Sequence, residues 1–216
     1  RERIPYEADA YINQLCHYAT DNDLQTTRDT FDLLMQQPTW PTEWAPHMIF
    51  MARADWLHTG DREWLAERYE SLKTKALFER RGADGLVTSN AQQMKRDDIV
   101  DWPPGERDGF VFSERNCVVN AFHLRALKDL EMLAIACSKP LDAQNHAREY
   151  ETSYTRFQEV FFNPVTGLYR DGIGTEHASI HANLFPLAFG LVPTERRAYM
   201  TEWLSDQGMA CSVYAA

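Results

Sequence analysis

The sequence lacks a long hydrophobic run, because His, Asn, Gln or Pro interrupts its longest uncharged stretches. A helix that crosses a membrane needs about 20 mostly apolar residues in succession, so we expect no membrane-spanning segment and no membrane partner. Basic residues are also in short supply: 22 Lys and Arg stand against 32 Asp and Glu, which gives a net charge of −10. This charge repels polyanions and no basic stripe offsets it, so we expect no nucleic-acid partner.

Cysteine is scarce as well. The four cysteines, at positions 16, 117, 137 and 211, form no close pair and do not have the spacing of metal ligands. Cys117 and Cys137 fall within one predicted helix and cannot bridge each other. We therefore expect small core residues rather than a disulfide framework or a zinc site.

Two motifs of metal or nucleophilic chemistry are incomplete. His177 and His181 lie four residues apart, but the zincin pattern needs a Glu directly after the first His, and Ala178 occupies that position. No G-x-S-x-G elbow occurs, which argues against a Ser-His-Asp hydrolase. We expect no metal site and no cofactor.

What is present indicates a helical domain large enough to bury a core: 216 residues, 25.0 kDa and 44% hydrophobic side chains. Apolar residues recur at helical spacing, with almost no strand-like alternation. Helices are predicted at about residues 7–19, 24–37, 44–58, 116–137, 141–162, 177–190 and 194–207, with a further helix starting at Cys211 and a short strand or extended arm within 168–174. Another helix is predicted after the turn at residues 59–61, with Leu65, Tyr69, Leu72 and Ala76 on its apolar face.

Short and long connections alternate between these helices, which indicates stacked antiparallel helix hairpins. A solenoid, a bundle and an (α/α) toroid all fit this pattern. The absence of a repeat of 34 or 40 residues disfavours tetratricopeptide and HEAT arrays. We favour an all-α toroid, because its long loops gather at one rim where a site can form. The long loop at residues 80–115 is the kind that usually carries function.

Aromatic residues make up 12% of the chain, and most of them are expected in the core. The segment 99–109 is unusual, because it places Trp102 beside Asp101 and two more carboxylates among rigid prolines. An aromatic plane with carboxylates suits the apolar face and the hydroxyls of a sugar. The alternative is a rigid surface connection anchored by a buried Trp.

Carboxylates also crowd the N-terminus, where Glu2, Glu7 and Asp9 surround Tyr6. Neighbouring carboxylates raise each other's proton affinity, as a general acid near neutral pH requires. The alternative is that these side chains favour a helix N-terminus through the macrodipole.

Three passages resemble the helical catalytic domain of bacterial α-L-rhamnosidases, glycoside hydrolase family 78. Residues 1–9 are similar to the R-E-x-x-G-W-x-x-D stretch of that family, and Asp101-Trp102 looks like its acidic-Trp loop. Residues 181–193 are close to the family's helix that ends in G-L-V-P. The order and spacing of the three passages agree along nearly the whole chain.

The resemblance implies an (α/α)6 toroid that hydrolyses terminal α-L-rhamnosides with inversion, so the expected partner is a rhamnose-containing oligosaccharide or glycoside. Glu2 matches the general acid, and Asp9 matches an acidic residue that binds the sugar. Tyr6 stands where the family has Trp, and Pro5 replaces its Gly. These two departures bear on the fit of the substrate at that wall.

The resemblance also implies that Trp102 and Trp44 form aromatic walls of the pocket and that Asp101 binds hydroxyls beside Trp102. The general base of the family lies on a later helix, which would follow Ala216. We therefore expect residues 1–216 to be a partial six-hairpin catalytic domain, inactive without the rest of its parent polypeptide. Residues 212–216 read as an uncapped first helical turn, which fits this expectation.

Two other functions stay open at this point: another α/α-toroid glycosidase with a different sugar specificity, and a helical carbohydrate-binding scaffold without catalysis. The compartment is equally open between the bacterial cytoplasm and the periplasm.

Overall fold

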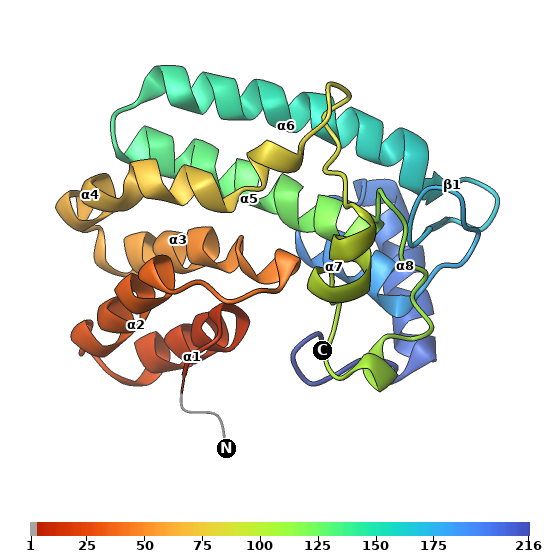
Figure 1. Ribbon diagram of the computed structural model, residues 1–216, viewed down its shortest axis with the longest axis horizontal. Coiled ribbons are helices and arrows are strands. Elements are labelled where there is room, and N and C mark those ends of the chain that lie inside the picture. Colours follow the sequence, from red (N-terminus) through yellow and green to blue (C-terminus); the bar gives the residue numbers. More distant parts are fainter. Residues whose placement is uncertain (1–3) are drawn as a thin grey trace.

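The computed structural model describes residues 4–216 and is mostly helical (63%), as Figure 1 shows. The all-α prediction is therefore confirmed. The α-helices of this part of the chain are α1 (Glu7–Thr20), α2 (Gln25–Gln36), α3 (His47–Thr59), α4 (Arg62–Leu72), α5 (Cys117–Ala136), α6 (Pro140–Phe161), α7 (Ile180–Ala188) and α8 (Thr194–Gln207). None of them is long and apolar enough to cross a membrane.

Side-chain caps fix where α5 and α7 begin. The side chain of Asn116 accepts a hydrogen bond from the amide of Val119 (2.8 Å) at the start of α5. At the start of α7, Ser179 accepts one from the amide of Ala182 (3.2 Å). Each bond satisfies an amide that has no partner within the helix.

Two predicted helices begin later than expected. The helix predicted from Trp44 begins at His47, because Pro46 stands at its N-cap and Trp44 belongs to a preceding 3-10 turn, Thr42–Trp44. The helix predicted from His177 begins at Ile180. Residues 175–179 before it have no regular structure, because Asp171 contacts the His177 ring and accepts a hydrogen bond from the Ser179 amide.

The helices pair in sequence into hairpins, α1 with α2, α3 with α4, α5 with α6 and α7 with α8. The first helix of each pair contacts the first helix of the next, so α1, α3, α5 and α7 form a continuous inner row. The second helices lie outside this row, with α6 along one edge of the molecule in Figure 1. Residues 4–216 thus form an arc of four hairpins.

The core centres on α5, which contacts α3, α4, α6 and α7. Fourteen of its 20 residues are buried, whereas Met200 is the one buried residue of α8. This difference is expected of an inner and an outer helix, because a helix that is apolar on most of its surface must be covered on most sides.

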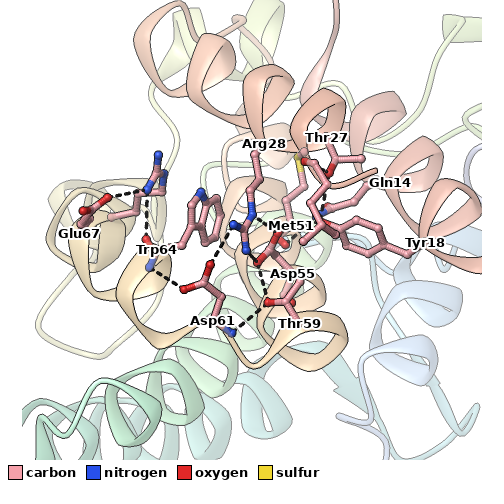
Figure 2. Close-up of polar contacts among 12 residues, drawn as sticks. Gln14, Tyr18, Thr27, Arg28, Met51, Asp55, Thr59, Asp61, Trp64 and Glu67 are labelled. Carbon is pink, nitrogen blue, oxygen red and sulfur yellow. Dashed lines mark hydrogen bonds and ion pairs between the residues drawn. The ribbon is translucent and has the colours of Figure 1, made fainter. Parts of the chain in front are cut away.

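A polar network joins the start of α2 to the end of α3 and the start of α4 (Figure 2). Arg28 on α2 donates two hydrogen bonds to the buried carboxylate of Asp55 on α3 (2.9 and 2.8 Å) and one to Asp61 (2.9 Å), the N-cap of α4. The ring of Trp64 lies between the guanidinium groups of Arg28 and Arg68, at 4.7 and 4.5 Å. The buried carboxylate is thus paired, which is the condition under which a buried charge is tolerated.

Outside the helices, the predicted strand is confirmed as β2 (Leu168–Tyr169), which pairs antiparallel with β1 (Phe162–Asn163). The helix predicted from Cys211 is wrong, since the residues after it form only a turn. The core placement of cysteine is confirmed for Cys117 and Cys211 but is wrong for Cys16, which is exposed.

Candidate functional site

One cavity collects most of the residues singled out in the sequence. Its volume is about 200 Å³, and it lies where the start of α1, the turn before α3, the loop before α5 and the segment after α8 meet. Its lining consists of Tyr6, Asp9, Trp40, Trp44, Ile99, Asp101, Trp102 and Tyr214. Five of the six predicted site residues therefore line this one cavity. The sixth, Glu2, lies outside the described residues.

Aromatic rings form most of this lining. The ring of Tyr6 meets that of Trp44 edge-on, with centroids 5.2 Å apart and planes at 73°. Trp40 and Trp102 are 44% and 57% exposed, a large exposure for the bulkiest apolar side chain. Exposed indole faces beside a cavity offer flat apolar surface, with a polar edge, to a ligand.

The start of α1 is tied to the Trp40 segment through Glu7. Its carboxylate is buried and accepts hydrogen bonds from the amide of Thr39 (2.8 Å) and from the hydroxyl of the same residue. Because Tyr6 precedes Glu7 and Trp40 follows Thr39, these bonds set two walls of the cavity relative to each other. Glu7 therefore does more than favour the start of α1, which was the alternative interpretation of this residue from the sequence.

A second buried carboxylate, Glu43, holds the loop that carries Trp102. It accepts hydrogen bonds from the amides of Ile99 (3.1 Å) and Val100 (3.0 Å). Val100 has a φ of 61°, a conformation that a β-branched residue adopts only when its surroundings impose it. Burial, and next the charge of Asp98, raises the pKa of Glu43 above its ordinary value. Glu43 thus links the Trp44 turn to the Trp102 loop.

Asp101 is fully enclosed by protein donors. One oxygen accepts from the Trp102 amide (2.7 Å) and the Ser212 hydroxyl (2.5 Å), and the other contacts His181 Nε2 (2.8 Å) and the Ser212 amide (2.8 Å). Burial would raise the pKa of Asp101, but the bonds from His181, Ser212 and Trp102 outweigh it and hold that pKa below its ordinary value. A carboxylate has about four acceptor positions. All four are filled, which leaves none for a sugar hydroxyl in this arrangement.

Tyr214 closes the cavity from the segment after α8. Its hydroxyl lies 3.1 Å from His47 Nε2, and His47 Nδ1 lies 3.1 Å from the main-chain oxygen of Glu43. Burial lowers the pKa of His47 to about 4, so the ring is neutral and donates from Nδ1 to that oxygen. Burial, and then the charges of Glu43, Asp101 and Asp9, raises the pKa of Tyr214 well above its ordinary value. The phenol therefore stays protonated and donates to Nε2.

The arrangement suits a small ligand with apolar faces and several hydroxyls. The cavity is smaller than the roughly 300–1,000 Å³ of sites for drug-sized molecules. Its rings supply apolar contact, and the exposed carboxylate of Asp9 is part of the lining.

No group of metal-ligating side chains occurs in the part of the chain that the structure describes. The two histidines of the incomplete zincin motif have separate partners: His177 Nδ1 lies 2.6 Å from Asp171, and His181 pairs with Asp101.

Sequence reasoning missed Trp40, Glu43 and Tyr214. The first two carried a usable signal, because Trp40 and Trp44 flank a short proline-containing turn that already holds one predicted wall. Nothing near Tyr214 in the sequence indicates that it reaches a loop more than 100 positions earlier.

The family model for the bacterial alpha-L-rhamnosidase 6 hairpin glycosidase domain matches residues 1–215. The rhamnosidase from Klebsiella oxytoca with rhamnose bound has a TM-score of 0.76 at 13% identity, and the match covers 97% of this chain and 43% of that one. No curated protein matches the sequence.

Two further solved structures are similar. The α-L-rhamnosidase from Dictyoglumus thermophilum has a TM-score of 0.69 at 19% identity, over 95% of this chain and 24% of that one. The GH78 family rhamnosidase of Bacillus sp. GL1 has a TM-score of 0.66 at 20% identity, over 79% of this chain and 18% of that one. The chain thus spans less than half the length of these three relatives.

An arc of helix hairpins with an aromatic cavity at its rim defines the class of helical six-hairpin glycosidase domains, here in partial form. Within that class, the chain belongs to the bacterial α-L-rhamnosidase six-hairpin glycosidase domain family, glycoside hydrolase family 78.

Proposed function

We propose that the cavity binds the terminal α-L-rhamnosyl unit of an oligosaccharide or glycoside, and that residues 1–216 are part of the catalytic domain of an inverting α-L-rhamnosidase. The observation that carries the proposal is the convergence of Tyr6, Asp9, Trp44 and Trp102, from separate segments, on one cavity. A relative of the same fold has rhamnose bound, which supports the choice of sugar.

Each lining residue has a role in this proposal. Trp44 and Trp102 contact the apolar faces of the ring, and Tyr6 covers the side next to Trp44. Asp9 accepts hydrogen bonds from sugar hydroxyls. Asp101 acts through others: it orients Trp102 and holds Ser212 instead of binding the sugar itself.

Glu2 is proposed as the general acid, seven residues before Asp9. It donates its proton to the leaving oxygen while a second carboxylate activates water on the opposite face of the ring. Inverting pairs stand roughly 6.5–9.5 Å apart to leave room for that water. The second carboxylate is proposed to lie on a helix that follows Ala216, so the chain is expected to bind the sugar without hydrolysing it.

Binding of the sugar tests the cavity directly. Calorimetric titration of the chain with L-rhamnose should show one site, and Trp102→Ala should weaken the affinity by roughly tenfold, since it removes one stacking face. Tyr199→Ala, which removes a half-exposed ring from α8, is the control and should leave the affinity unchanged. An unchanged affinity in Trp102→Ala would remove Trp102 from the site.

Turnover tests the general acid. In a protein that contains this chain together with the proposed closing helices, Glu2→Gln should lower kcat for a rhamnoside with a poor leaving group by at least about 100-fold, while the affinity for rhamnose is kept. Near-normal turnover would exclude Glu2 from this role.

One observation favours a second candidate, a related glycosidase with another sugar preference. Tyr6 and Pro5 occupy positions where the family pattern has Trp and Gly, and Tyr6 lines the cavity. A panel of aryl glycosides, assayed on the same protein, separates the two candidates by the sugar that gives the highest kcat/KM.

A further inference from the structure

An open groove continues from the cavity along the long loop before α5. Its volume is about 760 Å³, and Trp40, Ile99 and Trp102 line both the groove and the cavity. A unit attached to a sugar in the cavity can therefore extend into the groove without leaving the surface. The two exposed indoles stand at the boundary between the two spaces.

The groove has a charge opposite to that of the molecule. The chain carries −10 overall, yet Lys95, Arg96 and Arg107 all line this groove. Lys95 is exposed and makes no ion pair within residues 4–216. Arg96 is exposed too, and its ion pair is a long one to the adjacent Asp97 (3.6 Å).

The third cation is fixed in place. Arg107 donates from Nε to the main-chain oxygen of Asp101 (2.9 Å), and its guanidinium lies 5.6 Å from the Phe112 ring centroid. Its two terminal nitrogens make no hydrogen bond in the described part of the chain. These donors are therefore available to a ligand, on a side chain whose position is already set.

One carboxylate lines the groove, that of Asp98, but it is occupied. It is buried and accepts hydrogen bonds from Arg80 (3.3 Å) and from the side-chain amide Nδ2 of Asn116 (3.2 Å). Arg80 thus offsets the charge of Asp98. The three basic side chains of the lining leave the groove with a net positive charge.

We propose that this groove is a subsite for the leaving group, and that it selects a ring bearing a carboxylate next to the rhamnosyl unit. The proposal rests on the proposed function of the cavity. Trp40 and Trp102, which line both spaces, contact the leaving-group ring where it joins the rhamnosyl unit. Lys95, Arg96 and Arg107 face its carboxylate. A uronic acid and an aromatic acid both supply this chemistry.

Paired ligands test the proposal. The uronate arm compares methyl glycosides of α-L-rhamnosyl-(1→4)-glucuronic acid and of α-L-rhamnosyl-(1→4)-glucose. The aromatic arm compares 4-carboxyphenyl and 4-carbamoylphenyl α-L-rhamnoside. At low salt, calorimetry on the chain should show that the charged member of at least one pair binds more tightly than the neutral member. The difference in affinity should be about two- to fivefold for each cation that contacts the carboxylate. The preference should shrink in 0.5 M NaCl. The arm with the larger preference identifies the kind of ring.

Lys95→Gln is the informative variant, because this side chain is exposed and unpaired among the described residues, so its loss does not threaten the fold. It should reduce the charged-over-neutral preference by about two- to fivefold. Lys128→Gln removes the same charge from an exposed position of α5 and should leave the preference as it is.

Three results overturn the proposal, and they are distinguishable. Equal affinity for charged and neutral members, with both bound, overturns the subsite and leaves the cavity intact. A preference that survives Lys95→Gln and 0.5 M NaCl overturns the electrostatic origin, and with it the subsite. Failure of rhamnose and of all four glycosides to bind overturns the function of the cavity and the subsite together.

Discussion

Buried carboxylates, rather than exposed ones, organise the walls of the cavity. Glu7, Glu43 and Asp101 each accept at least two hydrogen bonds from segments distant in sequence. Each lies next to an aromatic wall residue in the chain, so orienting the carboxylate also orients its neighbour. Removing such a carboxylate destabilises the fold, because a buried donor that loses its acceptor has no water molecule to take the acceptor's place.

Asp101→Asn tests this arrangement at a single atom. The substitution keeps the shape but turns one acceptor oxygen into a donor, which then faces protein donors. The free energy of unfolding should fall by about 1–3 kcal/mol in a urea titration. Asp206→Asn, on the exposed surface of α8, is the control and should change it by less than about 0.5 kcal/mol. A stability loss equal in the two variants would contradict the role given to Asp101.

The sequence could indicate that Trp102 and Asp101 belong together, but not the different contacts that each makes at the cavity. An acidic residue beside a Trp in a proline-rich loop suits sugar binding, and the resemblance to the rhamnosidases implied that both side chains contact the ligand. Three of the four acceptor positions of Asp101 are filled by His181 and Ser212, 80 and 111 positions later. Pairings over such distances depend on the packing of the hairpins, which no local pattern encodes.

At the scale of helices, periodicity located α1, α2, α5, α6 and α8 to within about two residues. Two of the errors fall where a single residue overrides the pattern. Pro46 stops α3 from including Trp44, and Asp171 holds the residues before α7 out of the helix. The first of these exceptions lies at the cavity, because Trp44 is part of its lining.

Two inner helices also carry buried histidines that make stability depend on pH. Burial lowers the pKa of His47 on α3 and of His123 on α5 to about 4 each. In the unfolded chain a histidine titrates near 6.5. The unfolded state therefore binds protons first, and the stability present above pH 6.5 is lost as the pH falls toward 4.

We expect each of these histidines to contribute about 2 kcal/mol to the loss of stability between pH 7 and pH 5. His123→Gln should therefore show a smaller loss than the wild type over that interval by about this amount, measured by urea unfolding at each pH. Between pH 7 and pH 8 the two proteins should change in parallel, because the ring is neutral in both states. An identical loss from pH 7 to pH 5 would contradict the assignment to His123.

For the molecule as a whole, burial is distributed very unevenly between inner and outer rows. α5 contacts four other helices and is buried along most of its length, whereas α8 buries Met200 and little else. Helices with few buried contacts open at lower free energy than the centre of a core. The helices of the outer row are thus expected to open before those of the inner row.

Hydrogen exchange followed by mass spectrometry measures this order. Amides of α5 should exchange last, near the free energy of global unfolding, and amides of α8 should exchange among the first of the helices. Uniform protection across α5 and α8 would show instead that the hairpins open as one unit.

The unequal exposure of the indoles has one more consequence. Trp40 and Trp102 are the exposed ones, and both border the cavity, while Trp64 is shielded between two guanidinium groups. A soluble quencher such as acrylamide should therefore extinguish mainly the emission from the rim of the cavity. A ligand that covers those two rings would protect this fraction of the fluorescence, so the protein contains its own optical reporter of occupancy.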